Sequence, residues 1–182
     1  MRPDFHLEIG GSAELRALTP ADADALQSLV DANRVRLARW FAWVDDATGP
    51  EVHAAWLERI AADPRSMDGN GIWADDLVGG CDLQILPRDD LGELTFWLDE
   101  GALGRGLATR ACQALIDTAF REEELHRIQL RAGVENLRAR AVAKRLKMRE
   151  EGVLRGAGKV GGGLYADLVM YGLVVDDWRL SH

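Results

Sequence analysis

The chain has 182 residues, of which 47% are hydrophobic and 29% are charged. This length and composition are typical of a globular protein with one sizeable core, and they predict a single domain over residues 1–182. The formal net charge of −8 argues against extended binding to nucleic acid and suits a cationic partner, such as an amine or a basic protein tail.

Several further classes are excluded by what the sequence lacks. No apolar run approaches the length of a membrane span, and residues 1–5 carry no signal-peptide pattern, so we expect a cytoplasmic protein without membrane attachment. Cys81 and Cys112 each lie within an apolar pattern, which favours buried free thiols over a redox pair. The four histidines show no metal-ligand spacing, and we predict no metal site.

The first part of the chain predicts a strand and then helices. Alternating apolar positions over residues 5–18 indicate the strand. Thr19-Pro20 then begins a helix, because a hydroxyl N-cap followed by proline suits the first turn. We expect Asn33 to interrupt this helix, and a second short helix to run through residues 37–41.

A further helix is predicted from Gly49-Pro50 to Asp63-Pro64, followed by a polar, glycine-containing segment over residues 65–71 that we expect to be mobile. Strands over residues 72–74, 77–85 and from 93 onward then form an antiparallel meander, because short turn sequences separate them.

The third meander strand leads into the most informative segment of the sequence. Residues 93–99 alternate, with Leu94, Phe96 and Leu98 on one face, whereas apolar pairs recur every four residues after Thr109. The glycine-rich segment between them is therefore a turn from a strand into a helix. Free N–H groups at a helix start form an anion site, so we predict that a phosphate lies on Gly104–Thr109.

The type of phosphate site is narrowed by elimination. No Gly-Lys-Ser/Thr run is present, which excludes a kinase-type P-loop, and Gly104-x-Gly106-x-x-Thr109 fits the dinucleotide fingerprint poorly. A Gly-x-Gly sequence alone is equally typical of a turn that merely starts a helix.

The last third of the chain predicts a crossover and closing strands. Residues 126–132 form a strand that should lie parallel to the strand from residue 93, because a helix of about 15 residues connects them. A shorter helix follows over residues 137–146. Val153-Leu154 and residues 168–175 are strands, and the loop 156–163 is expected to be flexible. The overall prediction is an α+β fold with a mostly antiparallel sheet.

Over roughly residues 12–178 the sequence resembles the GCN5-related N-acetyltransferases, and most closely the RimJ/RimL branch that acetylates ribosomal-protein N-termini. The resemblance rests on Phe96–Asp99 with Gly104–Thr109, followed by these downstream matches: Glu135-Asn136, Glu150–Gly156, Tyr165–Asp167, Val169–Leu173 and Trp178. It implies a mixed sheet splayed between its two central strands, with acetyl-CoA wedged in the splay.

The resemblance also implies the residues that bind the donor. Main-chain amides of the loop would hold the pyrophosphate, with Arg105 and Arg110 as added charge unless they are simply solvated. The exposed backbone of the strand would pair with the pantetheine, and Asn136, which can also serve as a plain N-cap, would bind it too. The residues implied in cofactor binding are Phe96, Trp97, Leu98, Leu103, Gly104, Arg105, Gly106, Leu107, Ala108, Thr109, Asn136 and Arg140.

Catalysis requires a neutral amine and a stabilised oxyanion. An α-amine, with a pKa of about 7.7–8.0, needs only a modest base. Glu93 and Asp82, on adjacent meander strands, are the candidates, and a solvated polar strand face is the alternative for both. The Leu98 N–H is the candidate donor to the thioester carbonyl.

Two positions depart from the family pattern. Ala139 stands where the family has a serine thought to protonate the leaving thiolate, so water or Tyr171 would have to serve, unless Tyr171 only packs in the core. Lys147 replaces a glycine expected just past a helix end, at a cost of roughly 1 kcal/mol. The family usually has Gln or Arg where Leu103 stands.

The acceptor would lie between the early helices and the sheet, against a wall that includes Trp43, with Trp40, Leu37 and Asp82 nearby; most of the tryptophans have core packing as their alternative. The sequence thus predicts an N-acetyltransferase that acts on a protein N-terminal α-amine or a small amine through a ternary complex, with a homodimer implied by the resemblance only. Two alternatives stay open: a catalytically silent acyl-CoA-binding protein, and an enzyme with a larger donor such as succinyl-CoA.

Overall fold

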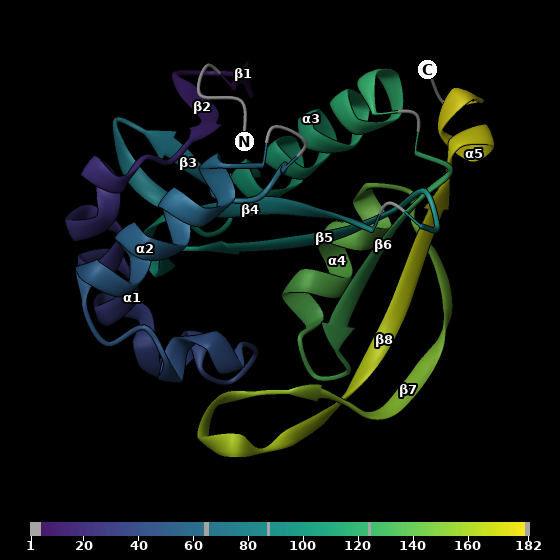
Figure 1. The fold of residues 1–182 in the computed structure, drawn as a ribbon. Coiled ribbons are helices and arrows are strands. Elements are labelled where there is room, and N and C mark those ends of the chain that lie inside the picture. The colour runs from purple at the N-terminus through teal and green to yellow at the C-terminus, as the bar shows by residue number, and fades with distance from the viewer. Residues whose placement is uncertain (1–4, 64–65, 87, 124, 181–182) are drawn as a thin grey trace.

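The computed structural model describes residues 5–63, 66–86, 88–123 and 125–180 (Figure 1). Its strands are β1 (His6–Glu8), β2 (Ala13–Ala17), β3 (Asn70–Ala74), β4 (Asp76–Leu86), β5 (Leu91–Leu98), β6 (Arg127–Gly133), β7 (Arg149–Lys159) and β8 (Tyr165–Val174). Its α-helices are α1 (Ala23–Leu37), α2 (Pro50–Ala61), α3 (Leu107–Glu122), α4 (Leu137–Arg145) and α5 (Val175–Arg179). Short 3-10 helices are η1 (Pro20–Asp22), η2 (Ala42–Asp45), η3 (Glu100–Ala102) and η4 (Gly161–Gly163).

The described strands form one mixed sheet in the order β1-β2-β3-β4-β5-β6-β8-β7. The β5–β6 pair is parallel, and the other neighbouring pairs are antiparallel. The right-handed βαβ rule explains this pair, because α3 returns the chain to the edge of β5. The predicted α+β fold and the predicted parallel pair are therefore confirmed.

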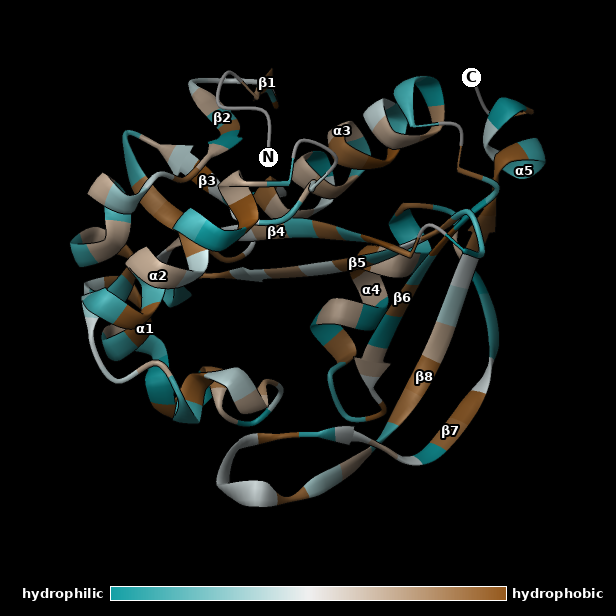
Figure 2. Ribbon diagram, in the orientation of Figure 1, coloured by the Kyte–Doolittle hydropathy of each residue, from teal (hydrophilic) through white to brown (hydrophobic). Residues whose placement is uncertain are grey.

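Helices cover both faces of the sheet. The amphipathic α3 buries its apolar face, including Leu115 and Ile116, against β4 and β5. Figure 2 shows the corresponding alternation of brown and teal segments along this helix. A second apolar cluster joins α1 and α2 to the opposite face through residues such as Val30, Leu57 and Trp97. Alternation along β5 accounts for the division, since Leu94 and Leu98 pack in the first cluster and Trp97 in the second.

Asn33 does not interrupt the first helix, contrary to the prediction. The helix α1 runs on to Leu37, residues 38–40 form a turn rather than a second helix, and Phe41 is extended. Asn33 is buried, and its side chain donates to Asp99 Oδ1 at 2.8 Å and accepts from the Glu100 amide at 3.1 Å. Because these bonds satisfy the side-chain amide of Asn33, this side chain does not compete for the main-chain hydrogen bonds of the helix.

Other boundaries also differ from the sequence prediction. The first strand is two strands, because Gly10 and Gly11 have positive φ angles and turn the chain between β1 and β2. The described part of the segment 66–71 is packed rather than loose: Met67 is buried and bridges to Leu83. Residue 65, the first of that predicted segment, lies outside the described residues, as do residues 64 and 87.

The segment 156–163, predicted to be a flexible loop, is the end of a β-hairpin. The strand β7 extends to Lys159, and the hairpin reaches across the molecule to the end of α1 (Figure 1). There the Gly161 amide donates to the Ala38 carbonyl at 2.7 Å, and the Gly162 amide donates to Asp45 Oδ2 at 2.7 Å. These bonds join the tip of the hairpin to the turn after α1 and to η2.

Cys81 and Cys112 are free, fully buried thiols with 3.6 Å between their sulfur atoms. Burial, followed by the contact with Cys112, raises the pKa of the Cys81 thiol. In the described ranges, no helix has both the length and the apolar character needed to cross a membrane.

Candidate active site

The parallel strands β5 and β6 separate partway along their length. Their pairing runs from Leu91 opposite Arg127 to Leu94 opposite Leu130 and stops there, whereas β5 stays paired with β4 as far as Leu98. Figure 1 shows the two strands diverging from their paired ends. Residues 95–98 of β5 therefore have one backbone edge that no strand covers.

The alternation of main-chain N–H and C=O groups along β5 determines which of them point to that open edge. The Asp99 amide donates to the Val78 carbonyl at 2.7 Å, so alternation places the Trp97 main-chain groups toward β4 and those of Phe96 and Leu98 toward the splay. Arg36 donates to the Leu98 carbonyl. The open edge thus offers the Phe96 carbonyl and the N–H groups of Phe96 and Leu98.

The predicted main-chain cradle for a phosphate follows directly after this edge. Gly104 and Gly106 have φ angles of 78° and 75°, a left-handed conformation that favours glycine, and they turn the chain into α3. Within the described residues, the amides of Gly104–Thr109 donate to no protein acceptor. A Cβ built at Gly104 would meet nothing within 4 Å, so the loop is open above this residue. Phosphate binding itself stays a prediction.

Two residues expected to give main-chain contacts to the cofactor do not fit that role. The Leu103 amide donates to the Glu100 carbonyl at 3.3 Å, so the free row of amides begins at Gly104. Trp97 directs its main chain to β4, and its side chain lines a cavity on the other face of the sheet. Both errors arise because strand phase and the η3 turn are not visible in the local sequence.

Arg110 is committed to the protein rather than to a ligand. Its Nε donates to the Ile9 carbonyl at 2.6 Å, and its Nη1 donates to the Arg105 carbonyl at 3.0 Å. The side chain thereby fastens the loop before α3 to the β1–β2 turn. Arg105 is exposed beside the loop, so its predicted role in attracting an anion stays a prediction.

A cavity of about 490 Å³ lies on the α2 face of β4 and β5, beside the start of the splay. Aromatic walls come from Trp43, Trp56 and Trp97. Its lining carries more acidic than basic groups, namely Asp46, Asp68, Asp82 and Glu93 against Arg59 and His53. Such a lining suits a cation with an apolar stem, since carboxylates and tryptophan faces both attract positive charge.

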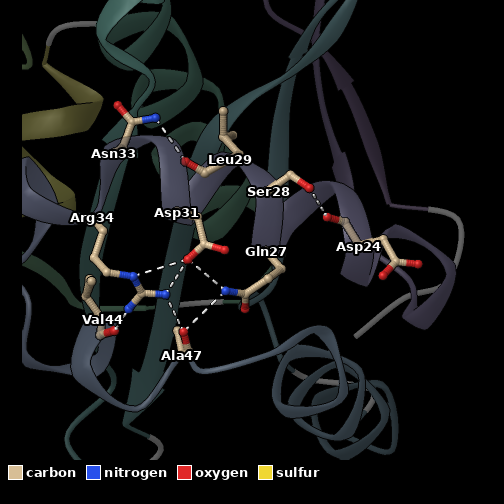
Figure 3. Close-up of polar contacts among 9 residues, drawn as sticks. All are labelled: Asp24, Gln27, Ser28, Leu29, Asp31, Asn33, Arg34, Val44 and Ala47. Carbon is tan, nitrogen blue, oxygen red and sulfur yellow. Dashed lines mark hydrogen bonds and ion pairs between the residues drawn. The ribbon is translucent and has the colours of Figure 1, made fainter.

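A polar network on α1 fixes the segment that supplies Trp43 and Asp46 (Figure 3). Arg34 donates to Asp31 Oδ1 at 2.6 Å and to the carbonyls of Val44 and Ala47. The bond from Gln27, and then that from Arg34, lowers the pKa of the Asp31 carboxyl. The network therefore holds the η2 segment against α1 and sets one wall of the cavity.

Glu93 lies in the cavity lining, but its carboxylate is bound on both oxygens. Arg131 donates to Oε1 from Nε at 2.7 Å and also from Nη2, and Gln129 donates to Oε2 at 3.0 Å. These contacts tie β5 to β6 where the strands still pair. Glu93 thus has a structural role here, and its predicted action as a base stays a prediction.

Asp82 occupies the adjacent position on β4 and faces the same cavity. Its Oδ1 accepts from the Asn70 amide at 2.9 Å, and it lies opposite Thr95 of β5. Burial, reinforced by the negative charge of Asp68, raises its pKa from 3.8 to about 7, against the lowering effect of the Asn70 and Gly69 amides. The structure thus brings together Trp43, Asp82 and Glu93, as predicted for the acceptor side.

Tyr171 is fully buried on β8, away from the cavity lining. Its hydroxyl donates to Glu150 Oε2 at 3.0 Å and accepts from Arg140 Nε at 3.1 Å, and Arg140 also donates to the Val134 carbonyl at 3.0 Å. This arrangement matches the core-packing alternative for Tyr171. It also gives Arg140 internal partners, so its predicted contact with the cofactor has no direct support.

Two residues predicted for the acceptor wall lie elsewhere. Leu37 is 1% exposed and belongs to the core cluster of α1 and α2. Trp40 packs against Gly133 at the end of β6, where an added Cβ would come within 2.8 Å of the indole ring. Asn136 caps α4 by accepting from the Ala139 amide at 3.1 Å, so its predicted second role at the cofactor remains untested.

Sequence reasoning missed His53 and Asn70 in the cavity. His53 is 6% exposed, and its Nε2 has no hydrogen-bond partner in the described protein; the Asn70 Oδ1 is likewise buried and unpartnered. Burial and the charge of Arg34 lower the pKa of His53, which keeps the ring neutral near pH 7. Helical spacing could have found it, because His53, Leu57 and Ile60 share one face of α2. Among the described residues, no group of three metal-ligating side chains is present.

Comparison with known proteins agrees with this geometry. A family model described as an acetyltransferase (GNAT) domain matches residues 13–149. The chain is 33% identical over 180 residues to YdaF of Bacillus subtilis, a putative ribosomal N-acetyltransferase, covering 96% of this chain and 98% of that protein. It is 32% identical over 103 residues to the ribosomal-protein-serine acetyltransferase of Escherichia coli, covering 56% and 57% of the two chains.

Solved structures give the same result. The crystal structure of a probable acetyltransferase superposes with a TM-score of 0.86 at 30% identity, covering 96% of this chain and 99% of that one. RimL, an α-N-acetyltransferase of a ribosomal protein that was solved with coenzyme A, superposes with a TM-score of 0.87 at 25% identity, covering 95% and 99%. Enzymes of this family use acetyl-CoA as the acetyl donor. Because the family model spans most of the chain and a relative aligns over nearly all of it, this protein belongs to the GNAT family and is an acetyltransferase.

Proposed function

We propose that the acceptor of this acetyltransferase is the N-terminal α-amine of a protein of the ribosomal kind. The observation that carries the proposal is the acidic, tryptophan-walled cavity beside the splay, because it suits the cationic end of a polypeptide. The relatives support the choice, since YdaF and RimL are both named for ribosomal acceptors. A small primary amine is the second acceptor class that such a cavity would take.

The residues present fit acetyl-CoA. Six consecutive amides over Gly104–Thr109 find no acceptor in the described part of the protein, which suits a pyrophosphate. The open edge at Phe96 and Leu98 suits the amides of an extended chain. When bound, acetyl-CoA supplies a thioester carbonyl and a thiolate leaving group.

The chain's own groups would then act on the reacting atoms. The Leu98 N–H, which faces the splay, is placed to donate to an oxygen that gains negative charge during attack. The cavity holds the amine, and a carboxylate of its lining receives a proton from the nitrogen. Ala139 offers no hydroxyl to the departing sulfur, and a thiolate with a pKa of about 8.5 can leave unassisted.

Acetyl transfer to a defined panel tests the proposal. The purified protein would be incubated with acetyl-CoA and peptides that differ in their first residues, an N-terminally blocked lysine peptide and small amines. Mass spectrometry should find one acetyl group on the α-amine, with the blocked peptide unmodified. Measurable acetyl-CoA binding without product on any acceptor would rule the proposal out and favour a silent acyl-CoA-binding protein.

The larger-donor alternative is separated by a competition between acetyl-CoA and succinyl-CoA. We expect the acetylated product to predominate, because no observation in the structure favours an anionic acyl group beside the acidic cavity. Succinylated product at equal donor concentrations would reverse this choice.

We further propose that residues 1–182 act as one cytoplasmic domain that forms a homodimer. The continuous sheet supports one domain. Exposed apolar side chains on the β7–β8 hairpin, including Leu154, Leu164 and Tyr165, support self-association, because β7 is also an edge strand. A concentration-dependent sedimentation measurement should give twice the monomer mass, and a monomer at 100 μM would contradict the dimer.

A further inference from the structure

The two carboxylates on the floor of the cavity have different surroundings. Glu93 on β5 is held by Arg131 and Gln129, which occupy three of its acceptor positions. Among the described residues, Asp82 on β4 forms no ion pair, and it accepts hydrogen bonds only from main-chain amides, those of Asn70, at 2.9 Å, and Gly69. An arginine-bound carboxylate is a poor proton acceptor, whereas a carboxylate without a cation binds a proton more readily.

The surroundings of Asp82 are built from the segment before β3. Asn70, which is 1% exposed, orients the carboxylate through its main chain and is itself fixed by a bond from Nδ2 to the Met67 carbonyl at 2.6 Å. Asp68, two residues earlier, lines the same cavity and adds negative charge. Burial also raises the pKa of Asp68, so the two acids form a pair that favours retention of a proton.

The position of Asp82 along the sheet suits a role in transfer. It lines the cavity and lies opposite Thr95, the first residue of β5 beyond the β6 pairing. The carboxylate therefore faces the cavity at the level where the splay begins. An amine held in the cavity would meet it directly or through one water molecule.

We propose that Asp82, rather than Glu93, takes the proton from the acceptor ammonium, and that Asp68 and Asn70 are positioning residues for it. This inference rests on the proposed function. The first proton of the nitrogen passes to the Asp82 carboxylate, and the neutral nitrogen then forms the amide bond as the C–S bond breaks. The second proton leaves with the sulfur, so one proton is finally released from Asp82 to solvent.

Other charged groups also face Asp82 and enter the interpretation of a pH profile. They are Asp68 before β3, Glu93 with its partner Arg131, Asp46 after η2, and His53 and Arg59 on α2. His53 is neutral near pH 7, because burial lowers its pKa, and Glu93 is paired. Burial raises the pKa of Asp82 to about 7, so this carboxyl titrates within the working range.

The test is the pH dependence of kcat between pH 5.5 and 9, with saturating acetyl-CoA and an α-amine peptide. We expect an acidic limb near pH 7 in the wild-type enzyme. Asp82→Asn should lower kcat by about 100-fold or more and abolish the limb, with acetyl-CoA affinity retained, because the isosteric amide keeps an oxygen for Asn70. Asp68→Asn should move the limb to lower pH, and Glu93→Gln should leave its midpoint in place.

Asp76→Asn is the matched control, because Asp76 is an exposed carboxylate on the same strand and should leave the profile as it is. If the wild-type enzyme is active and Asp82→Asn retains the acidic limb of the pH profile and at least a third of the wild-type kcat, the inference about Asp82 is wrong while the proposed function stands. An Asp68→Asn profile identical to that of the wild type would also overturn the inference. If the wild type binds acetyl-CoA and acetylates no amine, the proposed function fails first, and this inference fails with it.

Discussion

The Asn33 side chain donates a hydrogen bond of 2.8 Å to Asp99 Oδ1, across 66 positions of sequence. It joins α1 to the residue that follows β5 and caps η3. Asp99 in turn accepts from the Gly101 amide at 2.9 Å. The Asn33 bond, followed by the Gly101 bond, lowers the pKa of the Asp99 carboxyl against the opposing effect of burial. Asn33, on the opposite face of the sheet from α3, thus positions the residues that lead into the amides of Gly104–Thr109.

Asn33→Ala should therefore affect both stability and donor binding. Removing the side chain takes away the acceptor of the Glu100 amide and the donor to Asp99 Oδ1. We expect a loss of about 1–3 kcal/mol in the free energy of unfolding. Acetyl-CoA affinity should fall as well, because η3 leads directly into the cradle. Urea unfolding and calorimetric titration measure the two effects, and unchanged values in both would contradict the linkage.

Gly106→Ala tests the conformation of the cradle. Alanine at a φ of 75° costs about 1–2 kcal/mol, and the new Cβ would lie 3.1 Å from Arg110 Nη1. We expect acetyl-CoA to bind at least tenfold more weakly. Gly11→Ala, at a φ of 67° with no neighbour within 4 Å of the added Cβ, is the matched control. Gly11→Ala should lower the stability of the protein but not its affinity for acetyl-CoA. Equal losses of affinity in both variants would refute the assignment of Gly104–Thr109 as the phosphate site.

Lys147→Gly should stabilise the protein. Lys147 has a φ of 58°, and its amide and that of Met148 donate to the carbonyls of Lys144 and Ala143, which is the Schellman pattern in which glycine is preferred. We expect a gain of about 0.5–1 kcal/mol after the added freedom of the unfolded chain is subtracted. Thermal unfolding measures it, and Lys144→Gly, within the helix, should be destabilising by contrast. A lower melting temperature for Lys147→Gly would show the strain to be absent.

Asp82→Asn should be more stable than the wild type at pH 8. The folded-state pKa of about 7 lies above the ordinary 3.8, so the folded protein binds the proton more tightly. Its stability then falls as pH rises from about 4 to 7, and the full penalty is present above that range. The gain at pH 8 should be on the order of 2 kcal/mol, less than the pKa shift alone implies because the side chain is only half-buried in an open cavity. Unfolding at pH 5 and pH 8 measures it, and an equal difference at both values would contradict the assigned pKa.

Local periodicity was sufficient to predict β5, the loop and α3. The alternation over residues 93–99 and the four-residue repeat after Thr109 are both strong, and both match the structure. The glycines between them predicted a turn from strand to helix, and in the structure Gly104 and Gly106 make this turn in the left-handed conformation. These features depend on residues close in sequence.

The features that the sequence did not predict depend on distant partners. Asn33 is a poor helix former, but Asp99 and Glu100 satisfy it within α1. The glycine-rich segment 156–163 is ordered because Ala38 and Asp45 bind the tip of the hairpin. Likewise, Arg131 determines the state of Glu93, and no pattern along β5 reveals that contact.

The central claim is that the main-chain amides of Gly104–Thr109 bind the diphosphate of the donor. Amide chemical shifts, measured by NMR while coenzyme A is added to millimolar concentration, test it most directly. We predict large, saturable shifts for these amides and for those of Phe96 and Leu98, with the Leu103 amide less affected. Saturable binding of coenzyme A that leaves the chemical shifts of the Gly104–Thr109 amides unchanged would contradict this claim, and so would the absence of any binding.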